Sequence, residues 1–186
     1  NCGVAGVTND FTGTADASGT YPVGSTVVTW TVTDIHGNTN TCTQNITVTD
    51  DESPVISGCP ADIGPIGTDA GMCGATVTWV EPVASDNCEG VVAVTRTDGT
   101  GLNSGDIFPV GITTISYQAV DTEGNIATCS FTVTVNDTEP PVIGCVPDPM
   151  VPADAGQCYY TVTGTEFDPS GVSDNCGVLS VTNDYN

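Results

Sequence analysis

The chain of 186 residues contains no lysine, one arginine, one histidine and two leucines. Leu, Lys and Arg are strong helix formers, whereas Val and Thr, with 25 and 30 copies, favour strands, so the composition excludes a helical bundle. With 23 Asp and Glu residues, the formal net charge is −22. Such a charge repels phosphate and anionic lipid, and we expect no nucleic-acid partner and no membrane insertion by this segment. The composition therefore predicts an acidic all-β protein.

The nine cysteines include no Cys-x-x-Cys pair, and the one imidazole is that of His36. Zinc sites need closely spaced thiolates or several histidines, so these cysteines indicate disulfides and an oxidising, extracellular compartment. Cys176 has no counterpart at a matching spacing, and we expect its partner to lie beyond the given chain. The spacings predict four pairs, namely Cys2–Cys42, Cys59–Cys73, Cys88–Cys129 and Cys145–Cys158.

The sequence repeats itself. Sliding the chain along itself by about 86 to 88 residues superposes cysteines and short motifs, such as residues 21–26 on 108–113 and 50–56 on 137–143. A fixed period of this kind is typical of a tandem array. The predicted units are the C-terminal part of a first repeat at 1–49, a complete repeat at 50–136 and the N-terminal part of a third repeat at 137–186.

Within the complete repeat, β-branched segments of strand length are bounded by Gly, Pro, Asn and Asp. Apolar and hydroxylated residues alternate over 128–135, which indicates a strand with one buried face, and 121–125 is expected to be a hairpin loop. Trp30 and Trp79 alternate with β-branched neighbours and are predicted to be buried core residues. The predicted fold is a series of tandem immunoglobulin-like Greek-key β-sandwiches with antiparallel strands. The expected strands are 75–80, 91–96, 113–120 and 126–135.

Four motifs follow one another in a fixed order along the repeat. They are Asp-x-x-x-Pro-Val-Ile and a Cys over 50–59, Trp79 through Pro82 to Asp-Asn-Cys at 86–88, Phe-Pro-Val-Gly at 108–111, and Asp-x-x-Gly-Asn at 121–125 followed by Cys129. This ordered set resembles the hyalin-repeat (HYR) domain family over the whole chain, although the third copy has an insertion near 166–172. The resemblance implies immunoglobulin-like domains of extracellular proteins. Acidic, Thr-rich arrays of this kind also look like cell-surface adhesins of Bacteroidetes, including those of gliding motility.

Carboxylates recur in three places that an immunoglobulin-like sandwich brings to one end: the entering linker, the loop after the second strand and the last hairpin loop. Grouped without Lys or Arg nearby, they repel one another, and Ca²⁺ takes six to eight oxygens from such groups. We therefore expect structural Ca²⁺ at the repeat junctions. The alternative is that these residues only shape turns. The expected ligands are Asp50, Glu52, Asp86 and Asp121, with the corresponding residues Asp34, Asp137, Glu139 and Asp174 in the other repeats.

An enzyme is not expected, because His36 lies in a hairpin whose copy carries Glu123 instead. We expect a non-catalytic segment of an extracellular, cell-surface stalk or adhesin. Its partners are expected to be the neighbouring repeats of the same chain and a glycan or protein ligand that the sequence does not identify. The alternative is a subunit of a homopolymeric filament, in which other copies join by edge pairing or strand exchange. A remote alternative is an accessory domain of a carbohydrate-active enzyme.

Overall fold

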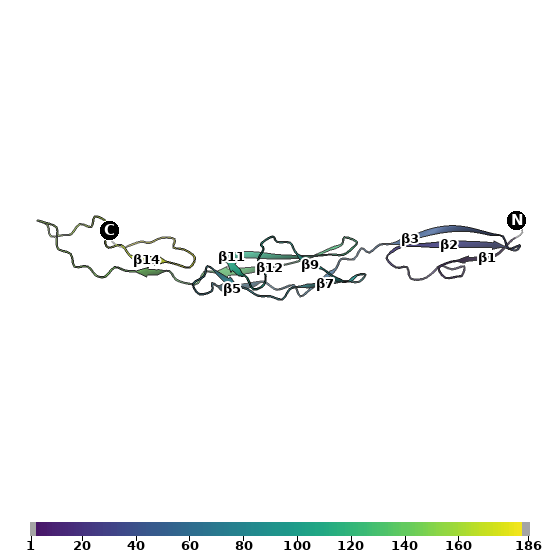
Figure 1. The fold of residues 1–186 in the computed structure, drawn as a ribbon, viewed down its shortest axis with the longest axis horizontal. Helices are drawn as coiled ribbons and strands as arrows, with labels where there is room; N and C mark the ends of the chain where they lie inside the picture. The colour runs from purple at the N-terminus through teal and green to yellow at the C-terminus, as the bar shows by residue number, and fades with distance from the viewer. Residues whose placement is uncertain (1–2, 184–186) are drawn as a thin grey trace. The chain divides into compact units, whose positions relative to one another are not determined.

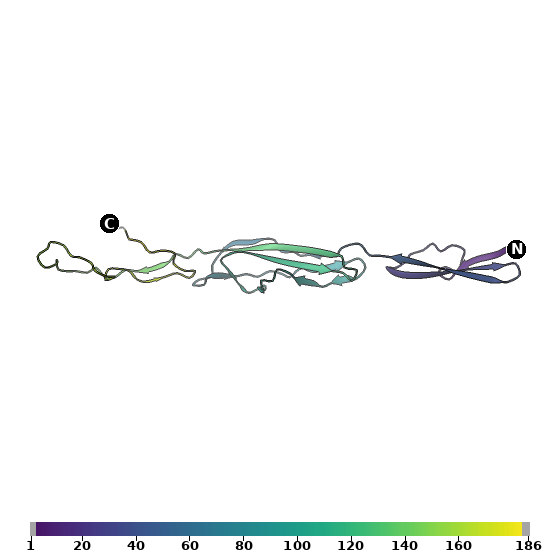
Figure 2. The ribbon, with the colours of Figure 1, turned by 90° about the horizontal axis from the view of Figure 1, so that it is seen from above.

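The computed structural model describes residues 3–183, and the regular structure of this part of the chain consists of β-strands (Figures 1 and 2). Within it, no helix has the length and apolar character needed to cross a membrane. The strands are β1 (Val4–Asn9), β2 (Gly24–Asp34), β3 (Thr39–Val48), β4 (Val55–Ser57), β5 (Ile63–Gly67), β6 (Gly74–Thr76), β7 (Val83–Asp86), β8 (Gly90–Val92), β9 (Val94–Arg96), β10 (Ile107–Pro109), β11 (Gly111–Val120), β12 (Ile126–Asn136), β13 (Val142–Gly144) and β14 (Ser170–Ser173).

The chain forms two compact units. The first contains the antiparallel sheet β1-β2-β3 and the small sheet β4-β7-β8. The second contains most of the sheet β5-β12-β11-β9, together with the pairs β10-β6 and β13-β14. An all-β fold of the immunoglobulin-like sandwich type is thus confirmed, while the boundaries of the three predicted repeats stay a prediction. The first unit comprises Asn1–Ile56, Val83–Val94 and Ala119–Ala127, and the second comprises Ser57–Pro82, Thr95–Gln118 and Thr128–Asn186.

The alternation predicted for β12 describes its two faces correctly. Phe131, Val133 and Val135 are 3%, 0% and 1% exposed, and Ile115 of the neighbouring strand β11 is buried as well. The intervening threonines of β12 are half-buried. The hydroxylated face therefore stays nearer to solvent while the apolar face is covered, as a period of two requires.

Two of the four expected strands are shorter or interrupted. The strand expected at 75–80 ends at Thr76, because beyond it Val77 and Trp79 hydrogen-bond to a loop. There, the Ser104 hydroxyl both accepts from the Trp79 amide and donates to its carbonyl, each at 2.8 Å. The strand expected at 91–96 is divided into β8 and β9. Loop partners thus replace the regular ladder beyond Thr76, whereas β8 and β9 are separated because they belong to different sheets.

The two indole side chains have different surroundings, and both are half-buried rather than fully buried. Trp79 packs edge-on against Phe108 and Phe131, with ring centroids 5.8 and 5.3 Å apart. Its Nε1 donates to the Tyr117 hydroxyl at 2.8 Å, and burial raises the pKa of Tyr117. Trp30 instead lines an open hollow of about 340 Å³ on the β1-β2-β3 sheet. The prediction of a buried aromatic anchor therefore suits Trp79 better than Trp30.

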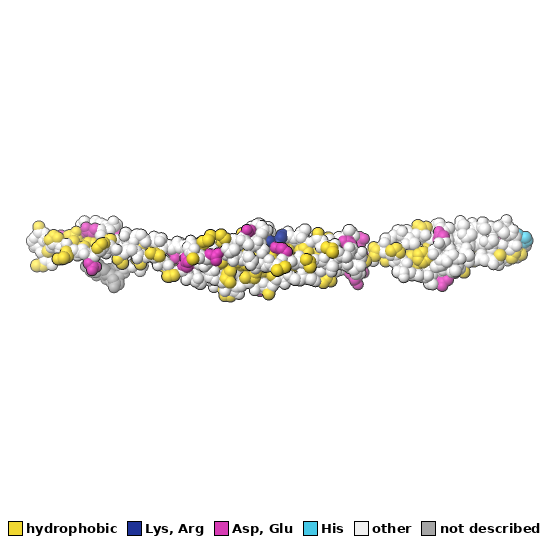
Figure 3. Space-filling view, turned by 60° about the horizontal axis from the view of Figure 1, so that its bottom comes forward, with side chains coloured by type: hydrophobic (Ala, Val, Ile, Leu, Met, Phe, Trp, Pro, Cys, Tyr) yellow, Lys and Arg dark blue, Asp and Glu magenta, His cyan; other side chains and the backbone are white. Residues whose placement is uncertain are grey.

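The single arginine of the chain is held by its own loop. Arg96 donates to both carboxylate oxygens of Asp98, from Nε at 2.7 Å and from Nη2 at 2.9 Å, and a third donor reaches the Leu102 carbonyl at 2.8 Å. The guanidinium also lies 5.4 Å from the centre of the Tyr117 ring. On the face shown in Figure 3, the dark blue of this side chain contrasts with small groups of acidic side chains.

Candidate functional site at the repeat junctions

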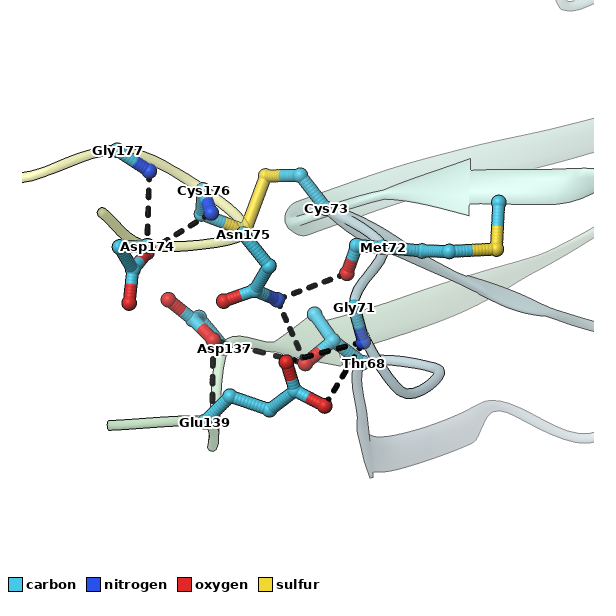
Figure 4. The surroundings of a disulfide bond; sticks show 10 residues. All are labelled: Thr68, Gly71, Met72, Cys73, Asp137, Glu139, Asp174, Asn175, Cys176 and Gly177. Atoms are coloured by element: carbon cyan, nitrogen blue, oxygen red, sulfur yellow. Dashed lines mark hydrogen bonds between the residues drawn. A yellow bond between two sulfur atoms is a disulfide. The ribbon is translucent and has the colours of Figure 1, made fainter. Parts of the chain in front are cut away.

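Two groups of residues surround the points where one sequence repeat passes into the next. The first seam is defined as residues 50–52, 86–88 and 121–125, all in the first compact unit. The second seam is defined as residues 68–73, 137–139 and 174–177, all in the second unit (Figure 4). The predicted Ca²⁺ ligands other than Asp34 lie in these two seams.

The first disulfide follows from a parallel strand pair. Cys59 bonds to Cys129 across a sequence separation of 70 residues, with Cα atoms 6.2 Å apart. On the paired strands β5 and β12, Ile63 lies opposite Val133, so the same parallel register extended four residues back places Cys59 opposite Cys129. The sequence interpretation paired cysteines by their spacing and missed this pair. Its assignments of Cys59 to Cys73 and of Cys129 to Cys88 are therefore wrong.

The second disulfide joins the predicted complete repeat to the predicted third repeat. Cys73 bonds to Cys176 across a separation of 103 residues, with Cα atoms 4.7 Å apart (Figure 4). The partner of Cys176 was expected to lie beyond the chain, and that prediction is wrong. Spacing within one repeat cannot reveal a bond between two repeats.

The remaining cysteines correct the rest of the predicted pairing. Among the described residues, four exposed cysteines form no disulfide, so the predicted bond Cys145–Cys158 is wrong. The predicted bond Cys2–Cys42 involves Cys2, which lies outside the described residues. The four are Cys42, Cys88, Cys145 and Cys158.

Hydrogen bonds accompany the disulfide in the second seam. The Gly71 amide donates to both carboxylate oxygens of Glu139 at 3.0 Å, and Gly71 has a φ of +72°, which favours glycine (Figure 4). The Asn175 amide group donates to the Met72 carbonyl at 2.8 Å and to the Thr68 hydroxyl at 3.4 Å. The turn before Cys73 is thus bound by side chains that come from the next repeat.

In the first seam, two carboxylates and a thiol lie together. Oxygens of Asp50 and Asp86 and the sulfur of Cys88 are all within 4.8 Å of one another, and Asp50 is 9% exposed. Interaction with the Asp50 carboxylate raises the pKa of Cys88 to about 11, with further contributions from burial and from nearby carboxylates. The Asn125 side chain donates to the Asp50 carbonyl at 3.1 Å and so ties the last hairpin loop to this group.

The predicted metal ligands also shape turns, as the alternative interpretation holds. Asp50 accepts from the Glu52 amide at 3.2 Å, and Asp86 accepts from the Cys88 amide at 2.8 Å. Burial raises the pKa of Asp121, but hydrogen bonds from Asn125 at 2.7 and 2.8 Å outweigh burial and lower it overall. Such Asx turns explain why Asp recurs at these places.

The copies of these residues in the other repeats behave in the same way. Asp34 accepts from the side chain and the amide of Asn38 and from the His36 amide in the β2–β3 turn, which lowers its pKa. Asp137 accepts from the Glu139 amide at 3.2 Å, and Asp174 accepts from the Cys176 amide at 2.8 Å. The eight predicted ligands therefore belong to several separate turns.

Only part of the predicted metal set fits a cation. The Oδ2 oxygen of Asp86 is buried and has no hydrogen-bond partner among the described residues, and it lies in the group that contains Asp50. These two carboxylates suit a hard cation such as Ca²⁺, which takes oxygen ligands, whereas a protonated thiol does not ligate it. The carboxylate of Asp121 already accepts hydrogen bonds from Asn125.

Sequence reasoning missed Gly71 and Asn175, which bind across the second seam, and gave Cys73 the wrong partner. A signal was present in the repeats, since Asp-Ala-Gly-x-Cys occurs at 69–73 and again at 154–158. Because the glycine and the cysteine of this motif occur in both copies, the motif indicates a turn whose cysteine has a specific partner. The partner itself could not be found without the fold.

Comparison with known proteins places the chain in a family. The HYR domain model matches residues 3–48 and 49–135. Hyalin of Lytechinus variegatus is 35% identical over 148 residues, which cover 76% of this chain and 27% of that protein. Hyalin of Strongylocentrotus purpuratus is 36% identical over 166 residues, or 85% of this chain and 13% of that protein.

More distant matches are weaker. A Rattus norvegicus protein, named sushi, von Willebrand factor type A, EGF and pentraxin domain-containing protein 1, is 34% identical over 62% of this chain and 3% of its own length. A crystal structure of the protocadherin GammaB4 extracellular domain is 22% identical, with a TM-score of 0.33 over 66% of this chain and 23% of that one. These relatives give no support to the resemblance to Bacteroidetes adhesins. On the family match over residues 3–135, the chain belongs to the HYR domain family.

Proposed function

We propose that this chain is a load-bearing, non-catalytic segment of an extracellular stalk or adhesin. The observation that carries the proposal is the Cys73–Cys176 disulfide, which joins two successive repeats in addition to the main chain. Glu139 and Asn175 add hydrogen bonds across the same seam. A joint with a covalent cross-link resists separation of the repeats under tension better than a flexible linker does.

The chemistry of the chain supports an extracellular setting. Disulfides persist in oxidising compartments, and two are formed among the described residues. The chain spans 27% and 13% of the two hyalin proteins that it matches, so the function of a whole protein enters here only as part of the proposal. Its net charge of −22 favours solubility and repels anionic surfaces.

A catalytic role is less well supported. His36 is exposed in the β2–β3 turn, and the copy of this turn in the complete repeat carries Glu123. A general base needs a substrate site and a partner that orients it. Neither the filament alternative nor the accessory domain of a carbohydrate-active enzyme is favoured by a specific contact among residues 3–183.

Single-molecule stretching tests the load-bearing role. With the ends of the chain attached to the force probe, the oxidised protein should keep the segment between Cys73 and Cys176 from extending. The two cysteines are 103 residues apart, so reduction should release on the order of 35 nm of additional length. The Cys176→Ser variant keeps the overlapping Cys59–Cys129 bond and should therefore gain only on the order of 11 nm without reductant, and reduction should release the rest. Equal extension of the oxidised and reduced proteins would contradict the proposal.

As a finer part of the proposal, Ca²⁺ binds between Asp50 and Asp86 and stiffens the first seam. The buried oxygen of Asp86 without a partner supports this placement. Backbone carbonyls and water would supply the other oxygens. Extracellular modules bind Ca²⁺ with dissociation constants of about 10⁻⁴ to 10⁻³ M, so 10 mM Ca²⁺ should stabilise the fold by about 1.4 kcal/mol at the weaker end of that range.

Calorimetry with and without a chelator measures this effect. The melting temperature should rise with Ca²⁺ in the unmodified chain but not in Asp86→Asn, whose amide oxygen still accepts from the Cys88 amide. Asp148→Asn changes an exposed carboxylate outside the seams and should keep the response. If the unmodified chain does not respond to Ca²⁺, the Ca²⁺ part of the proposal fails, and the disulfide-joined stalk is unaffected.

A further inference from the structure

The cysteines without a bond occupy positions that are bonded in the neighbouring repeat. Cys88 corresponds to Cys176, since both follow Asp-Asn, and Cys158 corresponds to Cys73, since both end Asp-Ala-Gly-x-Cys. Cys176 and Cys73 form the disulfide of the second seam. The same separation of 103 residues, counted back from Cys88 or forward from Cys158, falls outside residues 1–186.

The turn that carries Cys158 has the same internal geometry as the turn that carries Cys73. In the bonded turn, Asp69 accepts from the Thr76 amide at 2.8 Å, and its own amide donates to the Gly74 carbonyl at 2.7 Å. In the copy, Asp154 accepts from the Thr161 amide at 3.0 Å and donates to a carbonyl at 2.8 Å.

The glycines of the two turns match as well. Gly71 and Gly156 have φ values of +72° and +76°. The turn around Cys158 is therefore already formed in the conformation that the turn around Cys73 has in the seam.

The surface that carries Cys88 is formed in the same way. The Cys88 amide donates to Asp86 at 2.8 Å, and the Cys176 amide donates to Asp174 at 2.8 Å. The amides of Glu52 and Glu139 each donate, at 3.2 Å, to the aspartate two residues before them. Glu52 thus occupies the position from which Glu139 accepts the Gly71 amide. Asn87 likewise corresponds to Asn175, which binds the Met72 carbonyl.

We propose that Cys88 and Cys158 are sites of disulfide formation with further copies of this repeat. In a chain that carries a preceding copy, the cysteine equivalent to Cys73 bonds to Cys88. In a chain that carries a following copy, the cysteine equivalent to Cys176 bonds to Cys158. Every seam of the array then contains the same disulfide and the same two hydrogen-bonding side chains, a glutamate and an asparagine.

The disulfide within each repeat, of the Cys59–Cys129 type, extends to further copies in the same way. Cys42 corresponds to Cys129, and Cys145 corresponds to Cys59, the two cysteines bonded across 70 residues. That separation counted back from Cys42, or forward from Cys145, also falls outside residues 1–186. The 103-residue separation between repeats and the 70-residue separation within a repeat together give each of the four exposed cysteines a partner in a further copy. These four form no disulfide among the described residues.

The chemical step is an ordinary two-electron oxidation. The two thiols form one S–S bond, and a low-molecular-weight disulfide such as oxidised glutathione accepts the two electrons and two protons and is cleaved to two thiols. The exchange passes through a mixed disulfide with one of the two cysteines, which the second thiol then displaces. The seam holds the two sulfurs close together and thereby favours the intramolecular product.

An extended chain tests the inference directly. A copy of residues 50–88 is fused before residue 3, which completes the first repeat and adds a further cysteine of the Cys73 type. In this copy, Met72→Gln, the residue found at the corresponding position 157, marks its peptide by mass. The protein is oxidised with a glutathione mixture, and the remaining thiols are alkylated. Because the natural chain has no Lys and one Arg, it is digested without reductant by an Asp-specific protease.

The expected result is a linked peptide that contains the marked cysteine and Cys88, with alkylation of Cys88 about tenfold or more below that of the unextended chain. Cys88→Ser should leave the marked thiol free to be alkylated, whereas Cys145→Ser should leave the link intact. The chain's own Cys73–Cys176 peptide reports correct folding in the same digest. The inference is overturned if that peptide is present while Cys88 stays fully alkylated, or if the marked cysteine bonds elsewhere.

Discussion

At the scale of single residues, Asp98 shows how this acidic chain uses its one arginine. The side chain of Asp98 is 5% exposed and that of Arg96 is 24% exposed, and the pair is joined in a bidentate manner. The hydrogen bond from the guanidinium holds the pKa of Asp98 far below its ordinary value, with further help from the amides of Thr100 and Ser116. A covered, multiply bonded ion pair of this kind contributes more to stability than an exposed one.

Replacement of Asp98 by Asn should therefore lower the free energy of unfolding by about 1.5 to 3 kcal/mol at pH 7, the range for hydrogen bonds to charged groups. The folded-state pKa is depressed, so this stability is present above the ordinary Asp value of 3.8 and is lost as the pH falls further below it. Denaturant unfolding at several pH values measures the difference. A loss that does not depend on pH, or an equal loss in Asp148→Asn, would contradict this explanation.

At the scale of elements, the pairing of β5 with β12 determines the disulfide within the repeat. The sequence predicted β12 well, because eight alternating residues at 128–135 produce a clear period of two. It did not predict β5, whose five residues Ile63–Gly67 include two glycines and a proline. A strand of such composition has no periodic signal, and its parallel partner lies about 70 residues away in sequence.

Removal of both sulfurs of this bond, in Cys59→Ser/Cys129→Ser, should lower the stability of the second unit. A closed loop of 70 residues corresponds to about 4 kcal/mol in the chain-entropy model, and the overlapping Cys73–Cys176 bond reduces the observed loss. Guanidinium unfolding of the oxidised proteins measures it. Cys145→Ser is the control and should behave like the unmodified chain, and a double variant as stable as that control would refute the assignment.

At the scale of the whole molecule, the set of cysteines with free thiols distinguishes the observed disulfide pairing from the pairing predicted by spacing. Iodoacetamide applied to the native, unreduced chain should modify the four exposed thiols in full and should not modify the cysteines of the two disulfides. Peptide mass measurement, leaving Cys2 aside, gives the result. Modification of Cys73 or Cys176 before reduction, or a peptide linking Cys145 to Cys158, would contradict the structure.

The sequence by itself determined the all-β class, the period of the repeats, the hairpins and the turn-forming aspartates, because these depend on residues that are close together in the chain or copied at a fixed interval. Its grouping of acids was correct for Asp50 and Asp86, which approach each other in the first seam. Only the tertiary structure decided which cysteines bond. A parallel pair of strands and a contact between successive repeats join residues 70 and 103 positions apart, and no local pattern encodes such a distance.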